Sequence, residues 1–330
     1  MRTQPGTWHH GPRTNRRNER GQIIVIFALA LIAMIAMVGL ILDGGAAFAH
    51  RRDEQTASDL AALAGANAFL VNYDQPLTRD AAAVAAAREA ARVNGYEHAV
   101  GGVTVDVAID TTVGVEVTVD IDAPHENTFA RIVGMNSWQI ATTATAQTGF
   151  ADTAIGAGPM LFNVGAFDTD DGTPLPLYGD KDHPFTFSHG QGQSGDAPAE
   201  PGNMSWTDYS GDSNDNTNTV RDIIRGETSL EVTLNRGQYI GQHNNGQHAD
   251  LFEEIDTWVA VSDIPVPIVD ENGIFQGWAT FHVMSASRSD KTVTGYFKSN
   301  FVAQRLTIRS CSIDVDCPVY LGSFPLKLVN

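Results

Sequence analysis

The sequence predicts an α+β protein in three parts: an N-terminal transmembrane helix, a small α+β domain into which that helix extends, and a mainly β domain. Three observations predict it. Uncharged, mostly apolar residues run without interruption from Ile23 to Leu42. Helical and alternating patterns then follow one another over residues 51–147. Short alternating segments separated by turn residues fill the second half of the chain.

The run from Ile23 to Leu42 has the length of a membrane span. Its 20 residues, at about 1.5 Å each in a helix, cover about 30 Å, the thickness of a bilayer's hydrocarbon core. The apolar part of a signal peptide is shorter, about 7–15 residues. Ala47-Phe48-Ala49 has the small-x-small form that a signal peptidase accepts, but it lies seven residues beyond the apolar run. A retained anchor is therefore favoured, and cleavage after Ala49 stays open as the alternative.

Charge predicts how such a span is oriented. The chain has a formal net charge of −18, yet its basic leader, residues 1–22, carries five arginines and a single glutamate. Arg51 and Arg52 come only about two turns after the span. The positive-inside rule then places the leader in the cytoplasm and everything from Asp43 onward outside. The acidic remainder argues against nucleic-acid binding, which needs clustered Lys and Arg.

The segment after the span predicts a helix that continues out of the membrane, with a softening at Gly44-Gly45. Small apolar residues recur there at helical spacing: Ala57, Leu60, Ala61, Ala64 and Ala68. This face has two interpretations of equal weight. It could pack closely against a partner, or it could cover the core of its own domain.

Residues 20–69 closely resemble the N-terminal region of the TadG-like proteins, which belong to the TadE/TadG group of the Tad (Flp) tight-adherence pilus machinery. The resemblance depends on an ordered series: Arg20-Gly21 before the span, Asp43-Gly44-Gly45 after it, Arg51-Arg52, and the run Gln55 to Ala66. The series "TFARIVG…ATATA" over residues 128–146 is also similar to this family.

The resemblance implies a pilin-like α+β region over residues 43–149, and the local patterns agree with it. Residues 78–96 predict a helix, with Thr78 as N-cap and Gly95 as C-cap. Residues 103–110, 114–122 and 138–147 predict strands, and residues 123–135 predict a short helix.

The family implies a membrane-anchored, non-enzymatic component that assembles or anchors a Tad/Flp-type pilus. Its implied partners are the lipid bilayer, through Ile23 to Leu42, and Tad proteins such as a TadE-like pseudopilin and the platform proteins. The sequence differs from pilins at one position. Pilins and TadE-type pseudopilins carry a glutamate five residues after the cleaved glycine, and counting from Gly21 that position is Ile26. This departure argues against prepilin-peptidase cleavage and favours a protein that stays anchored.

Residues 150–330 predict a mainly β exterior domain, with a Gly/Asn/Asp-rich loop region at 168–219. Four strand-like segments are expected, at residues 228–242, 256–270, 272–286 and 291–301. Pro265 and Pro267 predict that the second of these is an edge strand or a connection.

Catalytic and metal-binding motifs are absent from the sequence, so we expect no enzyme, metal or cofactor. Many TadG proteins carry a von Willebrand A domain with a DxSxS metal site, which residues 208–213 and 285–289 do not supply. Residues 167–174 and 211–219 space oxygen donors like calcium loops without completing an EF-hand, so solvated turns are favoured over calcium. Surface histidines, rather than zinc ligands, are expected at four positions: His183, His189, His243 and His248.

Cys311 and Cys317 are the only cysteines, and an exterior location would favour a disulfide between them. Residues six apart on a straight strand would be about 20 Å apart, far beyond disulfide reach, so the bond requires the chain to turn back. Free thiols are the alternative.

Two functions from different classes remain open. The first is the pilus-assembly component. The second is a membrane-tethered extracytoplasmic domain that binds cell-wall or carbohydrate ligands. Both are single-pass cell-membrane proteins with a cytoplasmic N-terminus.

Overall fold

A computed structural model of the chain describes residues 19–73, 75–167, 182–189, 198, 201–210, 217–226, 231–240, 249–257, 263–299, 301–309, 311–312 and 317–329. The chain forms two compact units. The first contains Met1–Asp53 and Ala123–Ile140, and the second contains Glu54–Asp122 and Ala141–Asn330.

The secondary structure is mixed, as predicted. The helices are α1 (Glu19–Val71), α2 (Arg79–Val93), α3 (Thr217–Arg225) and α4 (Ala249–Ile255), with 3-10 helices η1 (Ala130–Val133) and η2 (Val164–Phe167). The first strands are β1 (Thr104–Asp110), β2 (Val115–Glu126), β3 (Ser137–Thr148), β4 (Thr153–Ile155), β5 (Met160–Asn163), β6 (Phe185–His189), β7 (Asn203–Trp206) and β8 (Glu231–Thr233). The remaining strands are β9 (Asp263–Val269), β10 (Phe275–Ser287), β11 (Thr292–Phe297), β12 (Phe301–Val302), β13 (Leu306–Thr307), β14 (Ser323–Phe324) and β15 (Leu326–Val329).

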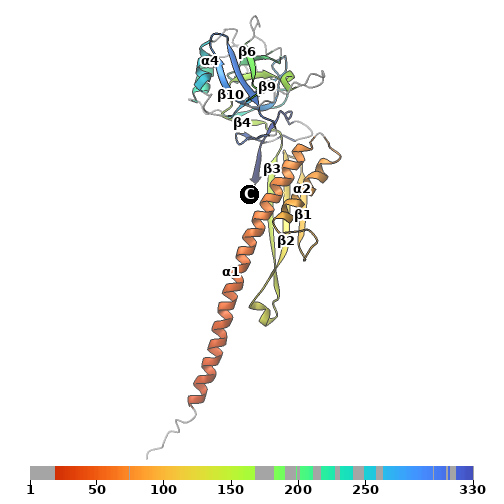
Figure 1. The fold of residues 1–330 in the computed structure, drawn as a ribbon, viewed down its shortest axis with the longest axis vertical. Helices are drawn as coiled ribbons and strands as arrows, with labels where there is room; N and C mark the ends of the chain where they lie inside the picture. Colours follow the sequence, from red (N-terminus) through yellow and green to blue (C-terminus); the bar gives the residue numbers. More distant parts are fainter. Residues whose placement is uncertain are drawn as a thin grey trace, which may run out of the picture. The chain divides into compact units, whose positions relative to one another are not determined.

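Helix α1 is one continuous helix of 53 residues, as Figure 1 shows. The expected softening at Gly44-Gly45 is not observed, because the helix passes through both residues unbroken. The residues from Ile23 to Leu42 are exposed, except Gly39. In the described part of the chain, α1 is the one helix long and apolar enough to cross a membrane.

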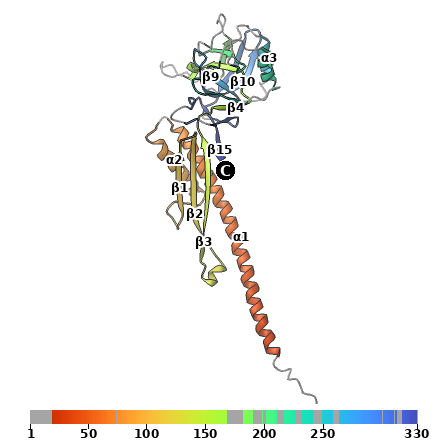
Figure 2. The same ribbon diagram turned by 180° about the vertical axis from the view of Figure 1, so that it is seen from behind.

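A four-stranded sheet follows, in the order β1-β2-β3-β15. Figures 1 and 2 show α2 and the C-terminal part of α1 on the same face of this sheet. Small residues allow this close layering: a Cβ built on Gly65 would lie 3.0 Å from Val117 Cγ1 and 3.2 Å from Ala87 Cβ. The strands predicted at 103–110, 114–122 and 138–147 are observed, and β15 joins them by pairing antiparallel to β3.

The alanine-rich face of α1 covers the core of its own domain. Ala57 and Ala61 are completely buried there, together with Ala62 and Ala66. Leu60 falls beside this face and is 44% exposed. Of the two interpretations of this face, the structure therefore favours the second for Ala57 and Ala61.

The short helix predicted at 123–135 is largely wrong. Strand β2 extends to Glu126, and only η1 is helical. The alternation of buried side chains in β2 continues through Ile121 and Ala123, so the period of two carries the strand past the predicted boundary.

Residues 160–297 contain a closed barrel, with the strands in the order β10-β11-β6-β7-β5-β9. Its core is aromatic: the rings of Phe162, Phe187, Phe281 and Phe297 contact one another at centroid distances of 4.9–5.7 Å. Helices α3 and α4 add apolar side chains to the same core. These helices have only 9 and 7 residues and were not predicted from the sequence.

The predicted edge position of Pro265 and Pro267 is wrong, since β9 pairs with both β10 and β5. The ladder to β5 involves only Ile268 and Val269 on the β9 side. The Pro265 carbonyl faces the β5 side, where it accepts a hydrogen bond from Gly158 N at 2.8 Å. Alternate residues of a strand point their backbone groups to the same edge, so Pro265 and Pro267 both lack an N–H group on the β5 side. Strand β9 makes no ladder hydrogen bond through these two N–H positions, so the prolines remove none.

The other strand-like segments are shorter than predicted. Strand β10 begins within residues 272–286 and ends one residue beyond them, and β11 lies within residues 291–301. Among the described residues of 228–242, β8 is the one strand. Strand β8 lies in a small sheet in the order β13-β4-β8, and β12 pairs with β14.

Candidate functional site

The first compact unit contains a loop that closes on α1. This tip loop, residues 127–136, connects β2 to β3 and includes η1. The backbone N–H of Asn127 donates to the Asn136 carbonyl at 2.9 Å, and that of Met135 donates to the Ala130 carbonyl at 3.1 Å. Gly134 ends η1 in the left-handed region, with φ of 86°, where a side chain would be strained.

Asp43 of α1 binds the start of η1. Its carboxylate accepts hydrogen bonds from three consecutive backbone N–H groups, those of Thr128 at 3.0 Å, Phe129 at 2.9 and 3.2 Å, and Ala130 at 2.6 Å. The first N–H groups of a helix lack partners within it, and a carboxylate satisfies them well. Asp43 is only 3% exposed, so water does not replace these contacts.

The environment of Asp43 favours its charged form. Burial raises the pKa of the carboxyl, but the hydrogen bonds from Ala130, Thr128 and Phe129 and the nearby His125 lower the pKa further than burial raises it. The net effect is a pKa below the ordinary value. Asp43 is therefore an ionised ligand of the tip loop.

Gly39 lies one turn before Asp43 and allows the tip loop to approach the helix. A Cβ built on Gly39 would lie 2.7 Å from Phe129 Cβ and 3.0 Å from Phe129 Cγ. By contrast, a Cβ built on Gly44 or Gly45 has no neighbour within 4 Å. Close contact with the tip loop explains the glycine at 39, and nothing in the structure explains those at 44 and 45.

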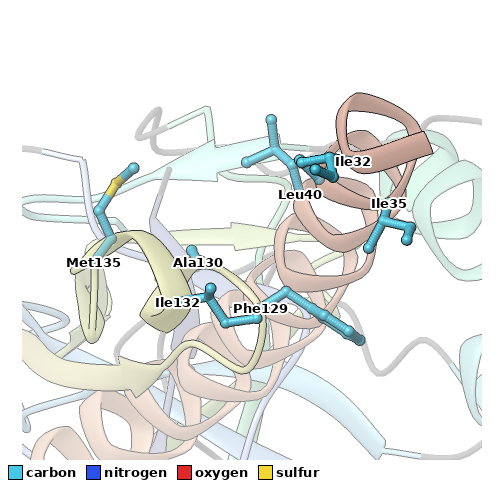
Figure 3. A pocket seen from close by; sticks show the side chains of 8 residues that line it. Ile32, Ile35, Leu40, Phe129, Ala130, Ile132 and Met135 are labelled. Carbon is cyan, nitrogen blue, oxygen red and sulfur yellow. The ribbon is translucent and has the colours of Figure 1, made fainter. Parts of the chain in front are cut away.

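An apolar groove of about 390 Å³ lies between α1 and the tip loop. Figure 3 shows Ile32, Ile35 and Leu40 on the helix side, and Phe129, Ile132 and Met135 on the loop side. On the loop, Ile132 is 83% exposed and Met135 is 53% exposed. We call this feature the α1–tip groove.

His50 and His125 form a pair on the same unit, with ring centroids 5.1 Å apart. Burial lowers the pKa of His50, and the charge of His125 lowers it further, while Asp53 acts in the opposite direction. His50 is therefore neutral over a wider pH range than an ordinary histidine.

A second polar cluster lies on the barrel. Oδ1 of Asp263 is 2.8 Å from His282 Nδ1 and 3.4 Å from Lys298 Nζ. Lys298 also lies over the Phe301 ring, 5.3 Å from its centroid. A cavity of about 370 Å³ adjoins this cluster and is lined by Asp263, Pro265, Thr280, Phe301, Val302, Ala303, Gln304 and Arg305.

Cys311 and Cys317, the predicted site residues, lie together as a bonded pair, with Cα atoms 4.8 Å apart. This Cα–Cα distance is within the range that a disulfide requires. Both residues are buried. The pair is capable of a disulfide, and its oxidation in the cell stays a prediction.

The remaining candidate ligands form no site in the described part of the chain, where no group of three or more His, Cys, Asp or Glu side chains could hold a metal. His183 lies just before β6, and His189 is the last residue of β6. His243 and His248, residues 168–174 and residues 211–216 lie outside the described residues.

From the sequence, Asp43 was recognised as the first residue after the apolar run and as part of the Asp43-Gly44-Gly45 series, but its partners were not predicted. Phe129, Ile132 and Met135 were placed in a helix rather than in an exposed loop. Their chemistry was visible in the sequence, but their exposure depends on how β2 and β3 present the loop.

Comparison with known proteins supports the resemblance of the N-terminal region. Residues 21–68 match a family model described as "Putative Flp pilus-assembly TadE/G-like". The match includes the apolar run, Asp43 and the alanine-rich part of α1. No curated protein and no solved structure matches the chain.

Proposed function

We propose that this chain, whose N-terminal region is TadE/G-like, is a membrane-anchored, non-enzymatic component that assembles or anchors a Tad/Flp-type pilus. Its partners would be a TadE-like pseudopilin and the platform proteins of the same machinery. The observation that carries the proposal is the family match, which includes the apolar helix and the Asp43 that binds the tip loop.

The Asp43 contacts favour retention of the helix. Cleavage after Ala49 would remove Asp43 and leave the backbone N–H groups of Thr128, Phe129 and Ala130 without their acceptor. Unsatisfied N–H groups of this kind are costly when buried. A folded domain that uses Asp43 in this way is therefore better explained by an anchor than by a signal peptide.

The orientation is proposed from charge. The arginines of residues 1–22 favour a cytoplasmic N-terminus, which puts the bulk of the chain outside the cell. Ile26, where pilins have glutamate, removes the acidic group that would pair with a neighbouring subunit in a fibre. We therefore propose a component that stays in the membrane.

The pilus role can be tested by deleting the gene in its native host and counting surface pili by electron microscopy. We expect pili to be lost or strongly reduced and to return with the wild-type chain. Affinity purification in mild detergent should recover a TadE-like pseudopilin or a platform protein. Normal piliation together with no such partner would contradict the proposal.

The second candidate function, an anchored domain that binds cell-wall or carbohydrate ligands, is favoured by the barrel cavity. Arg305, Gln304 and Asp263 offer polar groups there beside the Phe301 ring, a combination suited to a hydroxyl-rich ligand. Under this alternative, deletion would leave pili intact. Binding of purified protein to cell-wall sugars would be lost in Arg305→Ala but not in Arg236→Ala, an exposed arginine that does not line the cavity.

A further inference from the structure

We propose that the tip loop enters the outer leaflet of the membrane beside α1, and that lipid acyl chains fill the α1–tip groove. The anchor would then consist of one spanning helix and one inserted loop. This inference rests on the proposed retention and orientation of the helix, and it adds a second membrane contact to them.

The inference rests on the depth of the groove within the apolar run of α1. Its helical wall contains Ile32, Ile35, Ala36 and Leu40, all within the apolar run that ends at Leu42. At about 1.5 Å per residue, Ile32 lies about 15 Å below Leu42 along the helix. Because the hydrocarbon core is about 30 Å thick, the groove occupies its outer half.

The exposed side chains of the loop suit that depth. Ile132, Met135 and Phe129 are 83%, 53% and 39% exposed. These side chains form a single apolar surface with the exposed residues of the helix, which lipid must cover in any case. Exposure of these apolar side chains would be unfavourable in water, whereas it is favourable in lipid at the depth of the span.

Several backbone N–H groups of the loop have internal partners, which suits an apolar solvent that offers none. Asp43 accepts the N–H groups of Thr128, Phe129 and Ala130. The N–H groups of Ile132 and Gly134 donate to the carbonyls of Phe129 and Arg131, both at 3.0 Å.

The one charged side chain of η1 is paired with a residue outside the loop. Arg131 Nη2 lies 2.6 Å from Glu126 Oε2, at the end of β2. A long arginine side chain can hold its charge at the headgroup level while its stem stays in apolar surroundings. Trp138, half-buried in β3, suits the same interfacial level.

Lipid is a better occupant of the groove than a second copy of the chain. Every residue from Ile23 to Leu42 except Gly39 is exposed, and these residues lie on all sides of the helix, so no separate face is distinguished for another helix. Apart from Ala36 and Ala130, the groove walls are large, branched or flexible side chains, whereas close helix packing in membranes uses small residues.

Fluorescence quenching in vesicles tests the inference with the full-length protein. Ile132→Cys is labelled with an environment-sensitive fluorophore in a chain in which Cys311 and Cys317 are both serine. The protein is reconstituted in phosphatidylethanolamine/phosphatidylglycerol vesicles that contain lipids with a nitroxide in mid-chain. Ile26→Cys, in the span, and Leu77→Cys, on an exposed leucine outside the apolar run, are the matched controls. Labelling of Ile132→Cys in the disulfide-containing chain, without reductant, checks that the serine substitutions do not alter the result.

We expect the label at Ile132 to be quenched to within about a factor of two of that at Ile26, and the label at Leu77 to be unaffected. Quenching at Ile26 but not at Ile132 would overturn the inference and leave the anchor intact. No quenching at either position would contradict the anchor itself. Weak lipid quenching at Ile132 with cross-linking between Ile132→Cys chains would assign the groove to a second copy and overturn the inference.

Discussion

Oδ2 of Asp43 accepts the backbone N–H of Ala130 at 2.6 Å, across 87 positions of sequence. This contact joins the end of the apolar run to the tip loop between β2 and β3. It gives Asp43, part of the Asp-Gly-Gly series of the TadE/G-like region, a structural role. The aspartate is required where it lies because three N–H groups in succession need an acceptor there.

Replacing Asp43 by Ala should release the tip loop. Amide hydrogen exchange at Thr128, Phe129 and Ala130 in the detergent-solubilised protein should accelerate by at least about tenfold, since the three amides lose their acceptor. Asp53→Ala, at an exposed position of the same helix, should leave these amides protected. Unchanged protection in Asp43→Ala would show that the contact does not hold the loop.

Gly39→Ala should separate the helix from the tip loop, because the added methyl group would meet Phe129 Cβ at 2.7 Å. The same exchange measurement should show a loosened loop. Gly44→Ala is the matched control, since no atom lies within 4 Å of its Cβ position. We expect it to stabilise the helix by about 0.5–1 kcal/mol. Equal effects of the two substitutions would contradict the packing described here.

The His50–His125 pair should make the first unit sensitive to acid. The pKa of His50 is lowered below its ordinary value of 6.5. Neutral His50 therefore makes its full contribution to the stability of the folded state above pH 6.5. The contribution is lost as the pH falls from there through the lowered pKa. Histidine NMR should find His50 titrating below an ordinary histidine. His125→Gln should raise the pKa of His50 without restoring it fully, because burial remains; no rise would exclude the interaction.

Cys311 and Cys317 should be oxidised in protein purified from the cell exterior without reductant. Non-reducing peptide mapping should recover them in one cross-linked or looped fragment. Replacing both by serine should lower the free energy of unfolding by roughly 2–3 kcal/mol, the loop-entropy value for so short a loop. Quantitative alkylation of both thiols would refute the bond and weaken the case that this region is exported.

The apolar helix, the first three strands of the sheet and the β character of the second half could be predicted because each follows from local periodicity. The barrel closure could not, since it brings β5 beside β9, about 100 residues later. The role of Asp43 could not either: its partners lie 85 to 87 positions away. The prolines of β9 misled the prediction because their effect depends on which edge lacks a ladder, a property of the assembled sheet.

Mass spectrometry of the protein extracted from native membranes tests the central claim most directly, since the anchor, the Asp43 contact and the inserted loop all require the helix to be retained. We expect peptides that cover Ile23 to Leu42 and an intact mass that includes them. A mature N-terminus at His50, with those peptides missing, would contradict the account.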